Sequence, residues 1–129
     1  MCVCYMLKKM DNNAPVLLAI PSGDGQTIFP KMLGRAKYFY VYNIENGMHY
    51  HFLEKRNNPY AITNQHLKTL DVFNVISDCK IIVSAFIGKK GIQRLRVKGV
   101  MLIFKQGSIS NALASLINEQ EKIYQINRE

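Results

Sequence analysis

Residues 80–104 read KIIVSAFIGKKGIQRLRVKGVMLIF, and this stretch decides the fold. It begins with a buried apolar strand at residues 80–85. A helix then starts in the Gly-Lys-Lys-Gly segment 88–91 and runs to Lys98, where the glycine that follows suits the left-handed backbone that often closes a helix. A second apolar strand comes next, at residues 100–104. Strand, helix and strand in this order predict a right-handed crossover between two parallel strands.

Three further strands precede this unit. Residues 16–20 form a continuous apolar run, which is typical of a strand buried on both faces. Residues 37–44 are rich in aromatic side chains and predict a second strand. The turn Asn46-Gly47 supplies the positive φ angles that a tight hairpin needs, so we expect residues 48–55 to return antiparallel to the second strand.

Two more helices complete the pattern. Residues 65–77 place apolar side chains at helical spacing, with Thr63 or Asn64 as the N-cap. Ser108 is expected to cap a final helix. The order β-β-β-α-β-α-β-α predicts an α/β fold with a mixed five-stranded sheet and helices on both faces.

The 129-residue chain is basic, with 17 Lys plus Arg against 9 Asp plus Glu and a formal net charge of +8. Such a surface attracts nucleic acid, phosphates or an anionic cofactor. The length fits one domain, which we place at residues 15–122 between a flexible N-terminal tail at 1–14 and a C-terminal tail at 123–129. No apolar run approaches the roughly 20 residues that span a bilayer, and we expect a cytoplasmic protein.

The loop Leu33-Gly34-Arg35-Ala36 is the first candidate binding segment. It closes a long loop that begins at Ser22, and loops of this length in a compact domain are usually functional. Glycine lets a ligand approach the backbone closely. Arginine presents a fixed fork of donors to carboxylate, phosphate or sulfide. On the residues alone, a tight turn with a solvated arginine remains the alternative.

The segment Gly88-Lys89-Lys90-Gly91 is the second candidate. It lies where a strand passes into a helix, and a helix N-terminus presents free N–H groups and positive charge to anions. Its spacing excludes a Walker phosphate loop, and a solvated helix start is the alternative. We expect the strands at 16–20 and 80–85 to be neighbours. Both candidate loops would then leave the sheet at one edge, the usual place for ligands in such sheets.

Six short motifs, spread over about residues 16–118, resemble those of the dinitrogenase iron-molybdenum cofactor biosynthesis family. This family includes NifX- and NafY-type carriers and the C-terminal domain of NifB proteins. The motifs are Leu18-Ala19-Ile20-Pro21, Leu33-Gly34-Arg35-Ala36-Lys37-Tyr38-Phe39, Asp78-Cys79-Lys80-Ile81-Ile82-Val83-Ser84, Ile87-Gly88, Lys98-Gly99-Val100 and Gly107-Ser108.

The resemblance implies a ribonuclease-H-like three-layer fold and a non-enzymatic carrier. Its cargo would be an anionic iron-containing metallocluster, either the iron-molybdenum cofactor or an iron–sulfur precursor. Its partners would be the proteins that donate and accept that cluster. The family loop usually reads His-Phe-Gly-Arg-Ala, with the histidine as a candidate cofactor ligand, whereas Met32-Leu33 stands there in this sequence.

Methionine offers a soft sulfur but cannot replace imidazole as a base or a strong iron ligand. His66 is the other candidate inner ligand, unless it is an ordinary surface histidine at the start of its helix. The implied metal ligands are therefore Met32 and His66. The implied cofactor-binding set comprises Met32, Gly34, Arg35, His66, Gly88, Lys89 and Lys90.

Other metal-ligating side chains form incomplete sets. His49 and His51 share one face of their strand, but a metal site needs more ligands than this pair provides. Cys2 and Cys4 offer two thiolates in the N-terminal tail. Cys79 precedes a buried strand and is expected to lie in the core. An odd number of cysteines argues against a disulfide framework, so we expect reduced thiols.

Catalytic patterns are not evident. A two-metal nuclease needs carboxylates around the centre of the sheet, but the strand at 16–20 has none, and Asp24, Asp71 and Asp78 fall in loop or helix positions. We find no Ser/His/Asp pattern or reactive Cys/His pair, and we expect no enzymatic activity.

Two alternatives to the carrier remain open. One is a basic nucleic-acid-binding module, in which Tyr38 or Tyr40 stacks on bases. The other is a protein-interaction domain that uses the exposed edge of the strand at 48–55. In the first alternative, the side chains that would track phosphates are Lys31, Arg35, Lys37, Lys89, Lys90, Arg94, Arg96 and Lys98.

Overall fold

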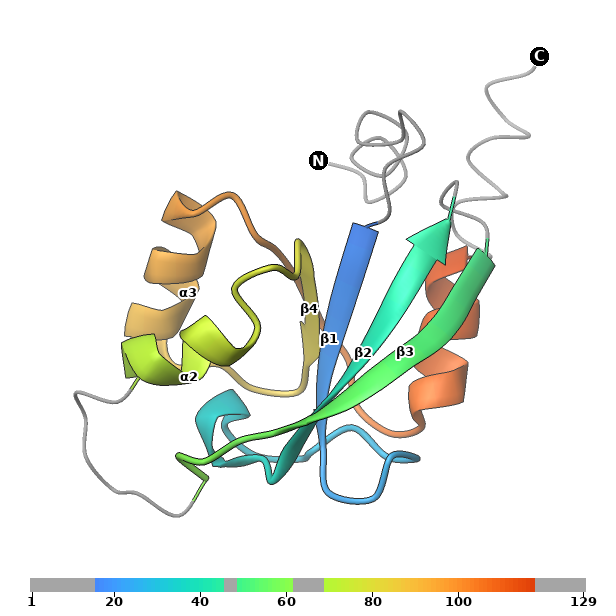
Figure 1. The fold of residues 1–129 in the computed structure, drawn as a ribbon, viewed down its shortest axis with the longest axis horizontal. Helices are drawn as coiled ribbons and strands as arrows, with labels where there is room; N and C mark the ends of the chain where they lie inside the picture. The colour runs from blue at the N-terminus through green and yellow to red at the C-terminus, as the bar shows by residue number, and fades with distance from the viewer. Residues whose placement is uncertain (1–15, 46–48, 62–68, 118–129) are drawn as a thin grey trace.

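The structure, a computed structural model, describes residues 16–45, 49–61 and 69–117. Its five strands form one mixed sheet in the order β3-β2-β1-β4-β5 (Figure 1). Strand β1 pairs antiparallel with β2 and parallel with β4, and β4 pairs parallel with β5. The predicted mixed sheet and the adjacency of its first and fourth strands are confirmed. The strands are β1 (Val16–Ser22), β2 (Tyr38–Glu45), β3 (His49–Asn57), β4 (Ile81–Ser84) and β5 (Met101–Phe104).

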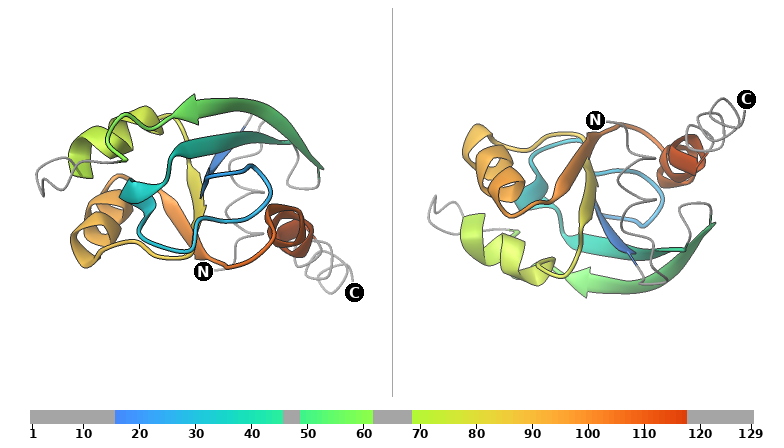
Figure 2. Two further views of the ribbon diagram at one scale, coloured as in Figure 1. Left: turned by 90° about the horizontal axis from the view of Figure 1, so that it is seen from below. Right: turned by 90° about the horizontal axis from the view of Figure 1, so that it is seen from above.

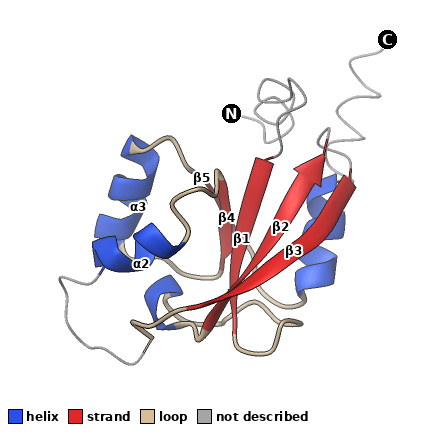
Figure 3. Cartoon of the chain, viewed as in Figure 1, coloured by secondary structure: helices blue, strands red, loops and turns tan. Residues whose placement is uncertain are grey.

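Helices cover both faces of the sheet, as the sequence predicts (Figures 2 and 3). Helices α2 (Thr69–Val75) and α3 (Lys89–Val97) lie on one face. A C-terminal helix, described over residues 109–117, lies on the other. The 3-10 turn η1 (Leu33–Arg35) stands between β1 and β2. None of the helices in the described part of the chain is long and apolar enough to cross a membrane.

Strand β1 separates two hydrophobic cores. Its side chains alternate between the faces, so that Leu18 and Ile20 pack with the C-terminal helix, while Ala19 packs with α2 and α3. All three residues are fully buried. The continuous apolar run in the sequence therefore marks the centre of the molecule.

Several element ends differ from the sequence-based expectation. Strand β3 continues to Asn57 rather than Lys55, because its pairing with β2 extends to Tyr38 opposite Asn57. Helix α2 ends at Val75 rather than Ser77. Helix α3 ends at Val97 rather than Lys98. The two predicted capping residues are confirmed: Gly99 lies just beyond α3 with a φ of 81°, and the Ser108 Oγ accepts a hydrogen bond from the Asn111 N–H at 3.3 Å.

Some predictions fall outside the described residues. These concern both terminal tails with Cys2 and Cys4, the Asn46-Gly47 turn, the N-cap at Thr63 or Asn64, and His66.

Arg56 joins the β3 edge strand to the segment after α2. Its Nη1 donates to the Val75 carbonyl at 2.8 Å, and its two terminal nitrogens contact the two carboxylate oxygens of Asp78 at 2.7 and 2.8 Å. The hydrogen bonds from Arg56 lower the pKa of Asp78 below its ordinary value of 3.8. Asp78 is thus engaged in an ion pair that joins β3 to the segment after α2.

The variant Asp78→Asn is expected to lower the free energy of unfolding by about 1 kcal/mol at pH 7, because a half-exposed ion pair contributes little more than this. The folded-state pKa lies below 3.8, so the stabilisation is complete above that pH and is lost as pH falls through the folded-state value. Urea unfolding at pH 7 and near pH 3 measures the effect. The variant and the wild type should converge in acid, and an undiminished gap near pH 3 would contradict the ion-pair assignment. Glu45→Gln, which removes a carboxylate 3.4 Å from the exposed His51 side chain, is the comparison with a second surface pair.

Candidate functional site

The long loop after β1 is held in one shape by its own polar groups. The Asp24 Oδ1 accepts hydrogen bonds from the backbone N–H groups of Gln26 and Thr27, both at 2.9 Å. These bonds lower the pKa of Asp24 and keep it ionised. The Ser22 hydroxyl donates to the Thr27 carbonyl at 2.6 Å. The loop therefore reaches η1 as an ordered segment.

The loop after β1 is bonded to the loop after β4. The Leu33 N–H donates to the Phe86 carbonyl at 3.0 Å, and Met32 forms a parallel bridge with Phe86. A Cβ placed on Gly88 would lie 3.1 Å from the terminal methyl carbon of Met32. The expectation that both candidate loops meet at one edge of the sheet is confirmed.

The Asn58 side chain holds η1 in place by hydrogen bonds to backbone carbonyls of the turn. Its amide nitrogen donates to the carbonyls of Gly34 at 3.0 Å and Ala36 at 2.8 Å. Its side-chain oxygen accepts from the Tyr60 N–H at 3.1 Å. The Asn58 side chain is buried, so these bonds satisfy polar atoms that water does not reach.

The exposed surface where the two loops meet is positively charged and contains the thioether sulfur of Met32. Arg35, Lys89 and Lys90 are exposed, and Met32 and Phe86 are about half exposed. Helix α3 starts after Gly88 with no acidic residue in its first turn and no side-chain cap. Its first N–H groups therefore retain the positive end of the helix dipole. This arrangement can hold an anion by charge, and Met32 adds a weak ligand for a soft metal.

Six of the seven predicted site residues lie in the two joined loops or at the start of α3: Met32, Gly34, Arg35, Gly88, Lys89 and Lys90. The seventh, His66, lies outside the described residues. Among the described residues no group of three or more His, Cys, Asp or Glu side chains is placed to hold a metal ion.

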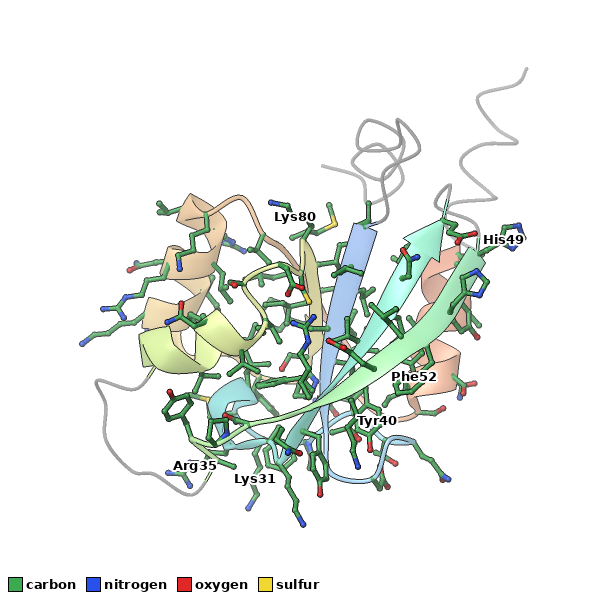
Figure 4. All side chains as sticks on the ribbon, viewed as in Figure 1. Lys31, Arg35, Tyr40, His49, Phe52 and Lys80 are labelled. Carbon is green, nitrogen blue, oxygen red and sulfur yellow. The ribbon has the colours of Figure 1, made fainter. Side chains whose placement is uncertain are left out.

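The other candidates from the sequence lie elsewhere. His49 is the first residue of β3 and lies far from Arg35 and Lys31 (Figure 4). The His51 Nε2 is 3.4 Å from a Glu45 carboxylate oxygen. Cys79 lies in the core as expected, where burial raises the pKa of its thiol to about 12. Asn58 is the residue that the sequence analysis missed. Its only signal, the Asn57-Asn58-Pro59 run, marks the end of a strand.

Replacing Asn58 with alanine tests whether it holds η1 in place. The change leaves the Gly34 and Ala36 carbonyls without their buried donor, so the free energy of unfolding should fall by about 1–3 kcal/mol. The amide protons of Arg35 and Ala36, which bond within the turn, should exchange faster in the native state. Asn57→Ala at the exposed neighbouring position is the matched control. Equal effects of the two substitutions would remove Asn58 from this role.

Comparisons with known proteins bear on the family and the fold. The family model described as dinitrogenase iron-molybdenum cofactor matches residues 14–119. A crystal structure of a protein named PH0822 superposes with a TM-score of 0.66 at 24% identity, covering 81% of this chain and 92% of the other. The apo form of the orange protein from Desulfovibrio gigas gives 0.62 at 20% identity, covering 81% and 88%. A putative NifB protein from Thermotoga gives 0.58 at 21% identity, covering 81% and 90%.

These structural likenesses show the fold. A search of curated proteins finds no match. The family model covers most of the chain, and the chain therefore belongs to the dinitrogenase iron-molybdenum cofactor family.

Proposed function

We propose that this protein is a non-enzymatic carrier of an anionic iron-containing metallocluster, either the iron-molybdenum cofactor or an iron–sulfur precursor. Membership of the family supports a role in handling a metallocluster. The observation that carries the proposal is the Leu33–Phe86 hydrogen bond at 3.0 Å. This bond joins the loop that holds Arg35 to the loop that precedes Lys89 and Lys90.

The residues of the two loops take different parts in the proposal. Arg35, Lys89 and Lys90 supply positive charge, and the Arg35 fork suits sulfide or carboxylate groups at the rim of a cluster. Gly34 and Gly88 would give the cargo access to the backbone. At Gly88 a larger side chain would also crowd Met32, because its Cβ would lie 3.1 Å from the methionine methyl carbon.

Metal ligation is the weakest part of such a site, and that suits a carrier. The thioether of Met32 binds iron more weakly than imidazole or thiolate, and His66 is the second candidate ligand. A cargo held mainly by charge can be released to an acceptor protein. The proposed partners are accordingly the proteins that donate the cluster and those that accept it.

The finer fold class and the location belong to the same proposal. We assign the sheet to the ribonuclease-H-like class, which the strand order β3-β2-β1-β4-β5 with an antiparallel β2 supports. A cytoplasmic location is supported by Cys79, a free buried thiol that suits a reducing compartment.

Anaerobic titration with isolated iron-molybdenum cofactor, read by absorbance and EPR, tests the carrier role. Arg35→Gln removes a charge-assisted contact and should weaken binding about 10- to 100-fold. The double variant Lys89→Gln/Lys90→Gln should also weaken it. Lys80→Gln is the matched control, because Lys80 lies at the other end of the sheet from Arg35 (Figure 4).

Direct coordination of the metal by a side chain is detected from the EPR spectrum of the bound cluster rather than from the binding affinity. Met32→Leu and His66→Ala should change the EPR signal of the bound cluster if either side chain is an inner ligand. No binding by the wild type, or an equal loss in Lys80→Gln and Arg35→Gln, would refute the site.

A further inference from the structure

Five aromatic side chains share one face of the β2–β3 hairpin. Strand β2 contributes Tyr38, Tyr40 and Tyr42, and strand β3 contributes Tyr50 and Phe52. The pairing places Tyr42 opposite Phe52 and Ile44 opposite Tyr50, so the five side chains point to the same side of the sheet. We call this group the aromatic face.

The rings of the aromatic face form an unbroken chain of contacts. Their centroids are 6.4 Å apart for Tyr38 and Tyr40, 6.0 Å for Tyr40 and Phe52, 5.6 Å for Phe52 and Tyr42, and 6.1 Å for Tyr42 and Tyr50. These are ordinary distances for tilted and edge-to-face pairs. Figure 4 shows Tyr40 and Phe52 on the same side of the hairpin.

The outer part of the aromatic face is open to solvent. Phe52 is 55% exposed, and Tyr50 is 37% exposed. The C-terminal helix packs against the part of the hairpin where Ile44 is buried in the hydrophobic core. Tyr42 is partly buried beside that core. A contiguous exposed patch of large aromatic side chains on a small domain usually marks a binding surface.

Lysines border the aromatic face. The Nζ of Lys55 lies 4.4 Å from the centroid of the Tyr38 ring, and the Nζ of Lys37 lies 5.4 Å from it. Both are within the range of cation–π contacts. Each ammonium group therefore lies beside the Tyr38 ring. From there it can contact the phosphate of a nucleotide whose base stacks on a neighbouring ring.

The carboxylates of the hairpin lie on the opposite face. Glu54 is paired with Val41 and holds Arg56, while Glu45 is paired with His49 and contacts His51. In the adjoining loop Asp24 precedes Gly25, which lies against the Tyr40 ring. The Asp24 Oδ1 is already bonded to two backbone N–H groups. The charge of the aromatic face is thus set mainly by its lysines.

We propose that the aromatic face binds single-stranded nucleic acid. Phe52 and Tyr50 would stack on unpaired bases, and Lys37 and Lys55 would contact the phosphates. This ligand matches both features of the surface, because each nucleotide carries a flat apolar base beside a negative charge. An apolar peptide would leave the lysines without partners, and a second copy of the chain would bring a further net charge of +8 to a surface that is already basic. The proposal is independent of the metallocluster site, which uses other residues.

Fluorescence anisotropy with labelled oligo-dT and oligo-U of about 12 nucleotides tests the proposal. Phe52→Ala and Tyr50→Ala should each weaken binding about 5- to 100-fold, the usual cost of removing one stacking ring. Phe104→Ala is the matched control, because Phe104 is 46% exposed on β5 at the other edge of the sheet. A duplex of the same length should bind more weakly than the single strand.

A salt series separates stacking from general attraction to a basic protein. Lys55→Gln should reduce the slope of log K against log salt by about 0.7, the value for one phosphate contact on a single strand. Lys80→Gln should leave the slope unchanged. Phe52→Ala should weaken binding at every salt concentration without altering the slope.

Several results would overturn the proposal. One is the absence of oligonucleotide binding, and another is equal binding by Phe52→Ala and Phe104→Ala. A third is sedimentation showing that Phe52→Ala converts a dimer to a monomer, which would make the face a contact between copies. Phe52→Ala should still take up the iron-molybdenum cofactor like the wild type, and Met32→Leu should still bind oligonucleotide, so either proposal can fail alone.

Discussion

The structure depends on the burial of the central residues of β1. Leu18, Ala19 and Ile20 are inaccessible to solvent on both faces, and the strand is hydrogen-bonded along both edges, to β2 and to β4. A strand in this position must be apolar at its centre, since an unpaired polar side chain there would enter one of the two cores. The one polar residue of β1, Ser22, lies at its end, where its hydroxyl donates to the Thr27 carbonyl. Its parallel pairing with β4 also brings the loops that follow these two strands to the same edge. The position of the candidate site is therefore a consequence of the core.

That edge becomes a defined surface through a few backbone hydrogen bonds. The Leu33–Phe86 bond joins the loops, and the Asn58 side chain holds the carbonyls on either side of Arg35. The charged side chains remain exposed while the backbone beneath them is fixed. Binding to such a surface orders side chains and little main chain, which limits the entropy that a ligand must overcome. The described side chains of this surface supply positive charge and the thioether sulfur of Met32, which suits the holding of an anion.

The sequence predicted the features that depend on local pattern. The apolar runs of β1 and β4, the helix after Gly88, its end at Gly99 and the cap at Ser108 all follow from neighbours within a few residues. The role of Asn58 could not be predicted, because its partners, Gly34 and Ala36, are more than 20 residues away in the chain. No feature of the neighbouring sequence distinguishes a buried asparagine from one in a turn. The length of β3 could not be predicted for the same reason. Its pairing with β2, and not its own composition, decides where the strand ends.

The β-bulge in the hairpin shows most clearly what a local sequence pattern cannot predict. The pairing changes register between Val41, which faces Glu54, and Tyr42, which faces Phe52. The residue between those two partners, Leu53, is the extra one. Strict alternation along β3 would place Phe52 on the same face as Glu54 and Arg56. The inserted residue instead turns Glu54 and Arg56 toward α2, where Arg56 bonds to Asp78, and leaves Phe52 among the tyrosines. One additional residue thus separates the ion pairs of the hairpin from its rings, and it creates the aromatic face that alternation alone would have divided.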